Sequence, residues 1–171
     1  MSNEDRRSQD LEGLARGLGE LLKQRGMMLA TAESCTGGWV GQVLTSVPGS
    51  SHWYDRGFIT YTNQAKRDML GVTTDVLARH GAVSAQTARA MVEGALANSR
   101  AQAALAITGI AGPGGGTAEK PVGTVWLAWA ASGREPVVVV EHFDGDRREI
   151  RRQAVGRALL GMLDFLEAER A

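Results

Sequence analysis

Cysteine is almost absent from this sequence of 171 residues, since Cys35 is the single one. One thiol cannot form an internal disulfide or a cysteine-based zinc site, and such scarcity fits a reducing compartment. We therefore expect a cytoplasmic protein. The three histidines, His52, His80 and His142, lack the spacing that would place two of them on one helical face, so the sequence predicts no metal site.

A surplus of charge is also missing. The 19 Lys and Arg residues balance the 19 Asp and Glu residues, which argues against a broad electrostatic surface for nucleic acid or an anionic membrane, though not against a local basic patch. The most apolar stretches, 122–131 and 137–140, are too short to span a bilayer. Residues 1–10 are polar and lack the character of a secretory signal. We expect a soluble protein that is not exported and binds neither nucleic acid nor membrane.

The hydrophobic periodicity alternates between helix and strand along the chain. Apolar residues at helical spacing predict an opening helix over 11–25 that ends at Gly26, and a strand follows from Met27. Further strands are expected at 54–61, 103–108, 122–131 and 137–143, and further helices from Ser34, Asn63, Ser84 and Asp146. Gly57 is expected to form a bulge, and the last two strands a hairpin.

This order of elements predicts an α/β protein. Helices that alternate with strands and a terminal hairpin favour a mixed sheet covered by helices on both faces, a three-layer α/β/α sandwich. We expect a single domain over residues 1–171, with residues 1–8 as a mobile N-terminal tail.

The most informative segment is Ala32–Gly38, where the hydrophobic period changes from that of a strand to that of a helix. The change predicts that a helix begins at Ser34. The first amides of a helix lack internal partners, so they would lie beside the Ser34 hydroxyl as donors for a developing oxyanion. The alternative is that Ser34 or Thr36 only caps the helix.

A serine attacks at neutral pH only if a base removes its proton. Tyr61 ends a predicted strand and Lys66 lies in the first turn of the next helix, so both are expected at the same edge of the sheet as Ser34. Burial or a helix N-terminus would lower the lysine pKa, and a serine and lysine pair with a tyrosine relay needs neither histidine nor metal. The alternative is a solvated lysine and a packing tyrosine. Cys35 is the rival nucleophile, ranked second because no histidine is positioned beside it.

Two further segments suggest anion binding. Five of the 22 glycines fall within 109–121, and although Thr117 breaks the dinucleotide fingerprint, backbone without side chains can approach an anion closely. A flexible surface turn is the alternative. Four arginines open the last helix, and they predict a phosphate contact unless neighbouring carboxylates neutralise them. They are Arg147, Arg148, Arg151 and Arg152.

Five motifs, taken together, carry a resemblance to a known family. They are Ala32–Gly38, Gly57–Tyr61, Gly81–Ser84, Thr108–Pro113 and Lys120–Val125. In this order they resemble the CinA C-terminal domain family, the nicotinamide-nucleotide amidohydrolases, in its stand-alone form. The resemblance implies a hydrolase that converts the carboxamide of nicotinamide mononucleotide to nicotinate mononucleotide and ammonia in pyridine nucleotide (NAD) salvage. It also implies a homo-oligomer and no cofactor.

The family's serine, tyrosine and lysine carry over to Ser34, Tyr61 and Lys66. We expect neutral Lys66, assisted by Tyr61, to take the Ser34 proton, while amides near Cys35 and Thr36 hold the oxyanion. The residues expected to contact the substrate are Cys35, Thr36, Gly37, Gly38, Thr108, Gly109, Gly112 and Arg147. A non-catalytic partner of competence or DNA-damage proteins, or a pyridine nucleotide sensor, is the alternative.

Overall fold

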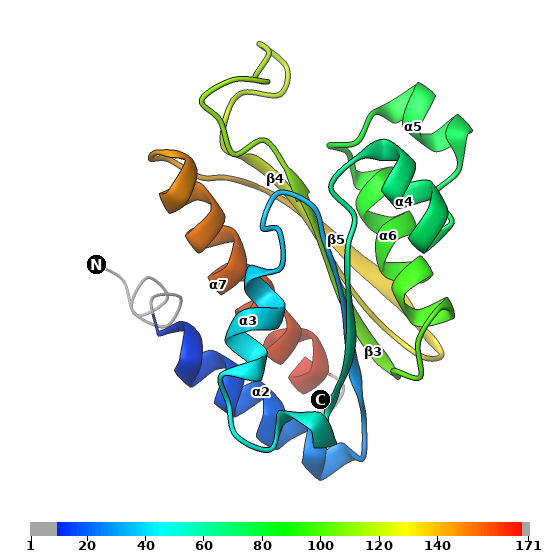
Figure 1. Ribbon diagram of the computed structural model, residues 1–171, viewed down its shortest axis with the longest axis vertical. Helices are drawn as coiled ribbons and strands as arrows, with labels where there is room; N and C mark the ends of the chain where they lie inside the picture. The colour runs from blue at the N-terminus through cyan, green and yellow to red at the C-terminus, as the bar shows by residue number, and fades with distance from the viewer. Residues whose placement is uncertain (1–9, 169–171) are drawn as a thin grey trace.

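The computed structural model describes residues 10–168 and contains one central sheet (Figure 1). The tail expected at residues 1–8 lies outside the described residues. Five strands form the sheet in the order β2-β1-β3-β4-β5. Their bounds are β1 Leu29–Glu33, β2 Tyr54–Ile59, β3 Ala103–Gly109, β4 Thr124–Ala131 and β5 Arg134–His142.

The sheet is mixed, as predicted. Strand β1 pairs in parallel with both β2 and β3, whereas β3 with β4 and β4 with β5 are antiparallel. The predicted hairpin is confirmed, and its turn is shorter than expected because only Ser132 and Gly133 separate β4 from β5. The carboxyl ends of β1, β2 and β3 therefore meet at one edge of the sheet.

Helices cover both faces of the sheet (Figure 1), and the predicted three-layer sandwich is confirmed. One face carries α2 (Leu11–Arg25), α3 (Trp39–Thr45) and α7 (Arg147–Glu167), and the other carries α4 (Asn63–Leu70), α5 (Thr74–His80) and α6 (Ala85–Ala97). A short 3₁₀ turn, η1 (Ser50–His52), precedes β2.

Side chains of different size line the two faces. Along β3, Leu105 and Ile107 belong to the core under α2, α3 and α7, whereas Ala104 and Ala106 face the core under α6. Alternation of side chains along a strand explains this division. Because all four side chains are buried, β3 is a central strand covered on both sides.

The helix ends test several sequence predictions. Gly26, in the left-handed conformation with φ 63°, ends α2 as expected, and Ser84 caps α6 by accepting a hydrogen bond from the Thr87 amide at 3.2 Å. Asn63 is not the cap of α4 but its first residue. The cap is Thr62, whose side chain accepts a hydrogen bond from the Ala65 amide at 3.1 Å.

The prediction of a bulge at Gly57 is wrong. The register of β2 shifts at Asp55, between the partners of Leu29 and Ala30. Gly57 instead gives room to Tyr54, because a Cβ at position 57 would lie 2.5 Å from the Tyr54 hydroxyl oxygen.

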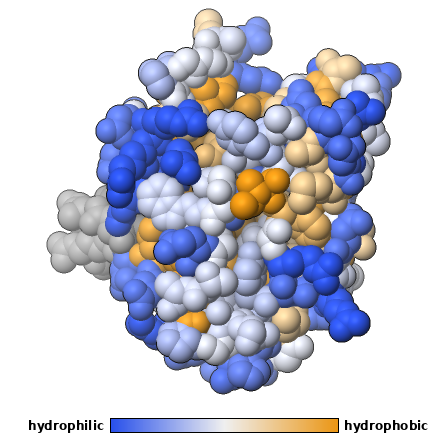
Figure 2. Space-filling model, in the orientation of Figure 1, coloured by the Kyte–Doolittle hydropathy of each residue, from blue (hydrophilic) through white to orange (hydrophobic). Residues whose placement is uncertain are grey.

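The surface carries few large apolar side chains. Those exposed are Ile59, Tyr61, Met69, Val122, Val137 and Val140. Figure 2 accordingly shows scattered hydrophobic spots among polar groups on the face that it presents. Within residues 10–168, no helix combines the length and the hydropathy that crossing a membrane requires.

Candidate active site

Ser34 follows directly after β1, at the edge of the sheet formed by the carboxyl ends of β1, β2 and β3. Its amide donates to the Ile107 carbonyl oxygen at 3.0 Å, which extends the pairing of β1 with β3 by one residue. Successive side chains of a strand point to opposite faces. The Glu33 side chain accordingly contacts α3, while the Ser34 hydroxyl contacts Lys66 of α4 on the other face.

The segment from Ser34 to Gly38 forms turns, and α3 begins only at Trp39. The expectation that a helix begins at Ser34 is therefore wrong. Gly37 (φ 58°) and Gly38 (φ 102°) explain the delay, because a right-handed helix cannot continue through such positive angles. Neither Ser34 nor Thr36 caps α3, since its N-cap is Gly38.

A buried carboxylate secures this turn. Glu33, only 2% exposed, accepts hydrogen bonds from the Thr36 hydroxyl at 2.6 Å and from the amides of Val40 at 2.9 Å and Gly41 at 3.1 Å. A negative charge at the N-terminal end of a helix is stabilising. Sequence analysis assigned no role to Glu33, although a carboxylate between a strand and a helix was the available signal.

Lys66 is 1% exposed, which is unusual for a lysine. Its Nζ donates to the Ser34 hydroxyl oxygen at 2.9 Å, to the Thr60 carbonyl oxygen at 2.8 Å and to the Tyr61 carbonyl oxygen at 3.3 Å. Burial disfavours the ammonium form and lowers the pKa of Lys66 to about 8. A substantial fraction of this amine is therefore neutral near pH 7 to 8 and able to accept a proton from the neighbouring hydroxyl.

Tyr61 approaches the site in a different way from the one expected. Its main-chain carbonyl contacts Lys66, while its side chain is 61% exposed. The phenol oxygen accepts a hydrogen bond from Arg147 of α7 at 3.1 Å, and the same guanidinium donates to the Gly112 carbonyl oxygen at 2.7 Å. The structure thus joins the hydroxyl of Ser34 with the amine of Lys66, and the phenol with Arg147.

The Cys35 thiol is buried, and burial disfavours its thiolate form. Burial is the largest cause that raises its pKa to about 11, so almost none of the nucleophilic thiolate is present at neutral pH. The three histidines do not line the cavity beside Cys35. These surroundings favour the Ser34 hydroxyl over the thiol as the attacking group.

A cavity of about 190 Å³ opens beside Ser34 and Lys66. Its lining residues are Ser34, Cys35, Tyr61, Lys66, Ala82, Val83, Thr108, Gly109, Ala111 and Arg147. Four of the expected substrate contacts therefore lie on the same cavity as the three expected catalytic residues, namely Cys35, Thr108, Gly109 and Arg147. Gly109 is required there because a Cβ would come within 2.9 Å of the Thr124 carbonyl oxygen.

The other expected contacts lie elsewhere. Thr36, Gly37 and Gly38 line a second, more open hollow of about 380 Å³ on the other side of the turn, together with Trp39, Gln42 and Arg151. Gly112 does not line the Ser34 cavity and reaches it only through its hydrogen bond with Arg147.

The Arg151 side chain donates hydrogen bonds to the main chain of the turn. Its Nε donates to the Cys35 carbonyl oxygen at 2.9 Å and its terminal nitrogen to the Thr36 carbonyl oxygen at 3.1 Å. The guanidinium also lies 5.4 Å from the centre of the Trp39 ring. Of the four arginines at the start of α7, Arg147 lines the Ser34 cavity and Arg151 does not.

Ala82, Val83 and Ala111 also line the cavity, and sequence analysis gave them no role. The Ala82 carbonyl oxygen accepts a hydrogen bond from the Thr108 hydroxyl at 2.8 Å, which joins the segment before α6 to the end of β3. Apolar residues carry no chemical signal of their own. Only the motifs Gly81–Ser84 and Thr108–Pro113, which contain them, pointed to this region.

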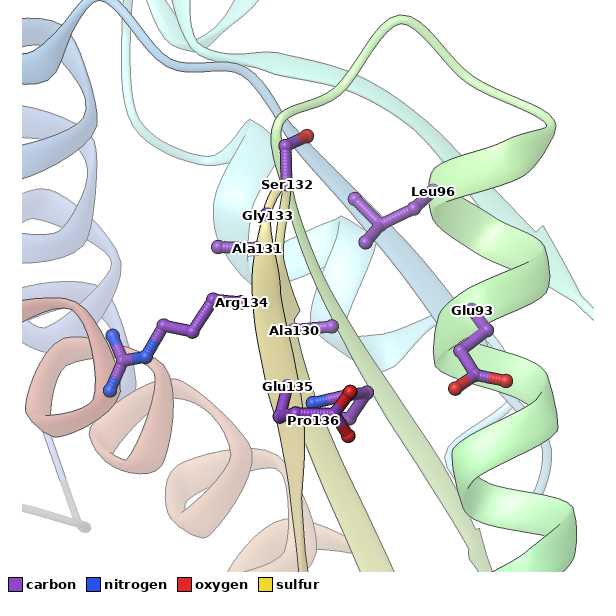
Figure 3. Close-up of a pocket in the computed structure, with 9 residues that line it drawn as sticks. All are labelled: Glu93, Leu96, Ala130, Ala131, Ser132, Gly133, Arg134, Glu135 and Pro136. Atoms are coloured by element: carbon purple, nitrogen blue, oxygen red, sulfur yellow. The ribbon is translucent and has the colours of Figure 1, made fainter.

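A larger hollow of about 430 Å³ lies at the opposite end of the strands (Figure 3). Its lining residues are Glu93, Leu96, Ala130, Ala131, Ser132, Gly133, Arg134, Glu135 and Pro136. Ala131 pairs with Ala103 at the start of β3, whereas Ser34 bonds to Ile107 near its end. In Figure 3 Arg134 points away from α6, toward α7, where it donates to the Phe165 carbonyl oxygen at 2.6 Å. This hollow has no part in the Ser34 site.

Candidate metal ligands do not gather anywhere in the described part of the chain. Between residues 10 and 168, no group of three or more His, Cys, Asp or Glu side chains has an arrangement that could hold a metal ion.

Comparison with known proteins places this geometry in a family. Residues 11–166 match the CinA C-terminal domain. Nicotinamide-nucleotide amidohydrolase PncC from Escherichia coli (strain K12) is 52% identical over 150 residues, which cover 88% of this chain and 91% of that protein. The protein of the same name from Pseudomonas putida is 49% identical over 152 residues, which cover 89% of this chain and 94% of that protein.

A solved structure agrees with the sequence comparison. The crystal structure of competence/damage inducible protein CihA from Agrobacterium tumefaciens superposes with a TM-score of 0.88 at 53% identity, over 92% of this chain and 96% of that one. The chain belongs to the CinA C-terminal domain family.

Proposed function

We propose that this chain is an amidohydrolase that converts nicotinamide mononucleotide and water to nicotinate mononucleotide and ammonia, in NAD salvage. Two relatives that cover most of the chain at 49% and 52% identity are named nicotinamide-nucleotide amidohydrolase. The observation that carries the proposal is the 2.9 Å contact between the buried Lys66 amine and the Ser34 hydroxyl.

The surroundings of Lys66 suit a base. A neutral primary amine has two N–H groups and one lone pair. The carbonyl oxygens of Thr60 and Tyr61 can take the two N–H groups, and the lone pair then faces the Ser34 hydroxyl. Three fixed partners thus match the three positions around the nitrogen, so little reorganisation precedes proton transfer.

The proposed reaction has two halves. In the first, Lys66 takes the Ser34 proton, the serine oxygen bonds to the carboxamide carbon, and the carbon–nitrogen bond breaks after Lys66 returns a proton to the leaving nitrogen. Ammonia leaves and an ester on Ser34 remains. In the second half, Lys66 takes a proton from water as the water oxygen attacks the ester. The bond between the carbonyl carbon and the serine oxygen then breaks, Lys66 returns the proton to that oxygen, and the acid product leaves.

Main-chain amides of the turn are the proposed donors to the oxyanion. In the described part of the chain, the amides of Cys35 and Thr36 donate to no oxygen or nitrogen of another residue. They follow directly after Ser34, so they can reach an oxygen on a carbon that is bonded to the serine. Preorganised amides of this kind strengthen their hydrogen bonds as the charge develops.

We propose that Tyr61 assists proton transfer from the rim of the cavity. Its oxygen accepts a hydrogen bond from Arg147, which leaves its own O–H free to donate to a bound substrate. The leaving nitrogen of the carboxamide is the group that such a donor would meet.

Arg147 is the proposed contact for the substrate phosphate. It is exposed and lines the cavity, and its hydrogen bonds to Gly112 and Tyr61 leave further N–H donors of the guanidinium for an anion. Arg151 suits this role less well because it does not line the Ser34 cavity.

We also propose a cytoplasmic homo-oligomer made of one domain per chain. The unpaired and protonated Cys35 thiol is compatible with a reducing compartment. Light scattering of the purified protein after size exclusion measures the oligomeric state.

Ammonia release from nicotinamide mononucleotide, free nicotinamide and glutamine tests the function. We expect the wild-type protein to release ammonia mainly from the mononucleotide. Ser34→Ala should lower kcat by about 10³-fold or more, because it removes the nucleophile. Cys35→Ala should lower kcat less than about threefold, because the thiol is protonated and the amide is retained.

Full activity of Ser34→Ala, or loss of activity only in Cys35→Ala, would discard the serine mechanism. Binding of the mononucleotide without ammonia release would favour a sensor over an enzyme. Thermal unfolding of both variants checks that each is folded.

A further inference from the structure

The two amides proposed to hold the oxyanion belong to peptide groups whose carbonyl oxygens are already bonded. In a planar trans peptide the N–H and the C=O point in opposite directions, so a bond to the oxygen also sets the direction of the amide. The Ser34 carbonyl oxygen accepts from the Gly37 amide at 3.0 Å. This bond within the turn directs the Cys35 amide away from Gly37.

The next peptide has no such local bond. The Cys35 carbonyl oxygen accepts from Arg151 Nε at 2.9 Å, and Arg151 is 116 residues away in sequence. The direction of the Thr36 amide therefore depends on a side chain of α7. Because the peptide is planar and trans, the Thr36 amide points away from Arg151 Nε.

Several contacts fix the guanidinium itself. Its second donor holds the Thr36 carbonyl oxygen at 3.1 Å, and the Trp39 ring lies beside it. Because the guanidinium is planar, two hydrogen bonds from adjacent nitrogens set its orientation as well as its position. Glu33 also secures this turn, because it accepts a hydrogen bond from the Thr36 hydroxyl at 2.6 Å.

We propose that Arg151 is a positioning residue for the amidohydrolase reaction, which holds the peptide between Cys35 and Thr36 so that the Thr36 amide donates to the oxyanion. The inference rests on the proposed function. Arg151 acts through the main chain and touches neither the substrate nor the Ser34 hydroxyl.

The test compares Arg151→Met with Arg151→Lys and with the matched control Arg148→Met. Arg148 is exposed on the same helix, so its replacement removes the same charge without touching the turn. Arg151→Lys keeps the charge but cannot hold both carbonyl oxygens with a planar fork. For each variant, kcat and KM for nicotinamide mononucleotide and the unfolding temperature are measured, together with the rate at which a fluorophosphonate probe labels Ser34.

We expect Arg151→Met to lower kcat by about 10- to 100-fold, less than the roughly 10²- to 10³-fold loss on deleting an oxyanion donor, with KM changed less than about threefold. The labelling rate should fall in parallel, because labelling also places negative charge on an oxygen beside the turn. Arg151→Lys should recover little of this loss, and Arg148→Met should retain the wild-type kcat.

Three results would overturn the proposal. One is a kcat for Arg151→Met within twofold of that for Arg148→Met. Another is a raised KM with an unchanged kcat, as expected of a phosphate contact. The third is full recovery in Arg151→Lys, which would indicate a role for charge alone. If Arg151→Met does not fold, Arg151→Lys against Arg148→Met still decides between recovery and loss.

Failure of the proposed function has a different signature. A wild-type protein that labels at Ser34 but releases no ammonia from the mononucleotide would reject the substrate, and the labelling rates would still test Arg151. Activity retained by Ser34→Ala would instead reject the nucleophile.

Discussion

Two basic side chains line the same cavity from opposite layers of the fold. Lys66 comes from α4, is 1% exposed and is enclosed by main-chain carbonyl groups, whereas Arg147 comes from α7 and is exposed to solvent. Burial lowers the pKa of Lys66 to about 8. A guanidinium keeps its charge in either environment.

The difference assigns each side chain a task. A buried amine that loses its proton easily is suited to act as a base, while an exposed and permanently charged group is suited to bind an anion. Residue type and burial act together here, because an arginine at position 66 would stay charged despite its burial. The variants below test whether the two roles are separate.

The largest effect is expected at the buried position. Lys66→Met keeps the length and apolar stem of the side chain but removes the base, so kcat should fall by about 10³-fold, within the range for general-base catalysis. Steady-state ammonia release measures the loss. Lys66→Arg is the matched control, since it keeps the positive charge, and it should be about as inactive; a Lys66→Met protein with more than a tenth of the wild-type kcat would contradict a base at this position.

The pH dependence of kcat/KM should follow the same amine. The active form is neutral Lys66, so activity should rise with pH through a midpoint near 8 and fall about tenfold per unit below it. From pH 8 to pH 6 the loss is then about 50-fold. A profile that is flat from pH 6 to pH 9 would argue against this assignment, and Arg147→Met should keep the same midpoint if the two roles are separate.

A smaller effect is expected at the exposed position. Arg147→Met should raise KM for nicotinamide mononucleotide by about 10- to 150-fold, since a charge-assisted hydrogen bond to phosphate is worth roughly 1.5 to 3 kcal/mol, with little change in kcat. Hydrolysis of nicotinamide riboside, which lacks the phosphate, is the control and should change less than about threefold. An equal loss on both substrates would show that Arg147 acts mainly through Tyr61 and not on the phosphate.

Local patterns predicted most of the architecture. Hydrophobic period and capping residues predicted the helices at 11–25 and from Ser84 and the hairpin of β4 and β5. The observed bounds of these elements agree with the predicted ones to within a few residues. The predicted start of α3 at Ser34 was wrong because the two glycines before Trp39 adopt positive φ angles. Composition alone does not reveal which conformation a glycine takes.

The sequence predicted the pairing of Ser34 with Lys66 but not the contacts that the arginines of α7 make, and the reason is physical. Ser34 and Lys66 could be expected at one edge of the sheet because each follows a strand end, and they lie in hydrogen-bond contact. The bonds of Arg151 to the turn and of Arg147 to Tyr61 join residues 116 and 86 positions apart. Contacts of this kind depend on how α7 packs against the sheet, and no periodicity encodes them.

The setting of the Lys66 amine has a consequence for how this protein can diverge. Two of its three partners are carbonyl oxygens of residues 60 and 61, and the Thr60 hydroxyl makes no hydrogen bond within the part of the chain that the structure describes. A carbonyl oxygen is the same whatever side chain follows it. The residue at position 60 can therefore be exchanged for another of similar volume in evolution, and the main-chain carbonyl oxygens that contact the Lys66 amine are retained.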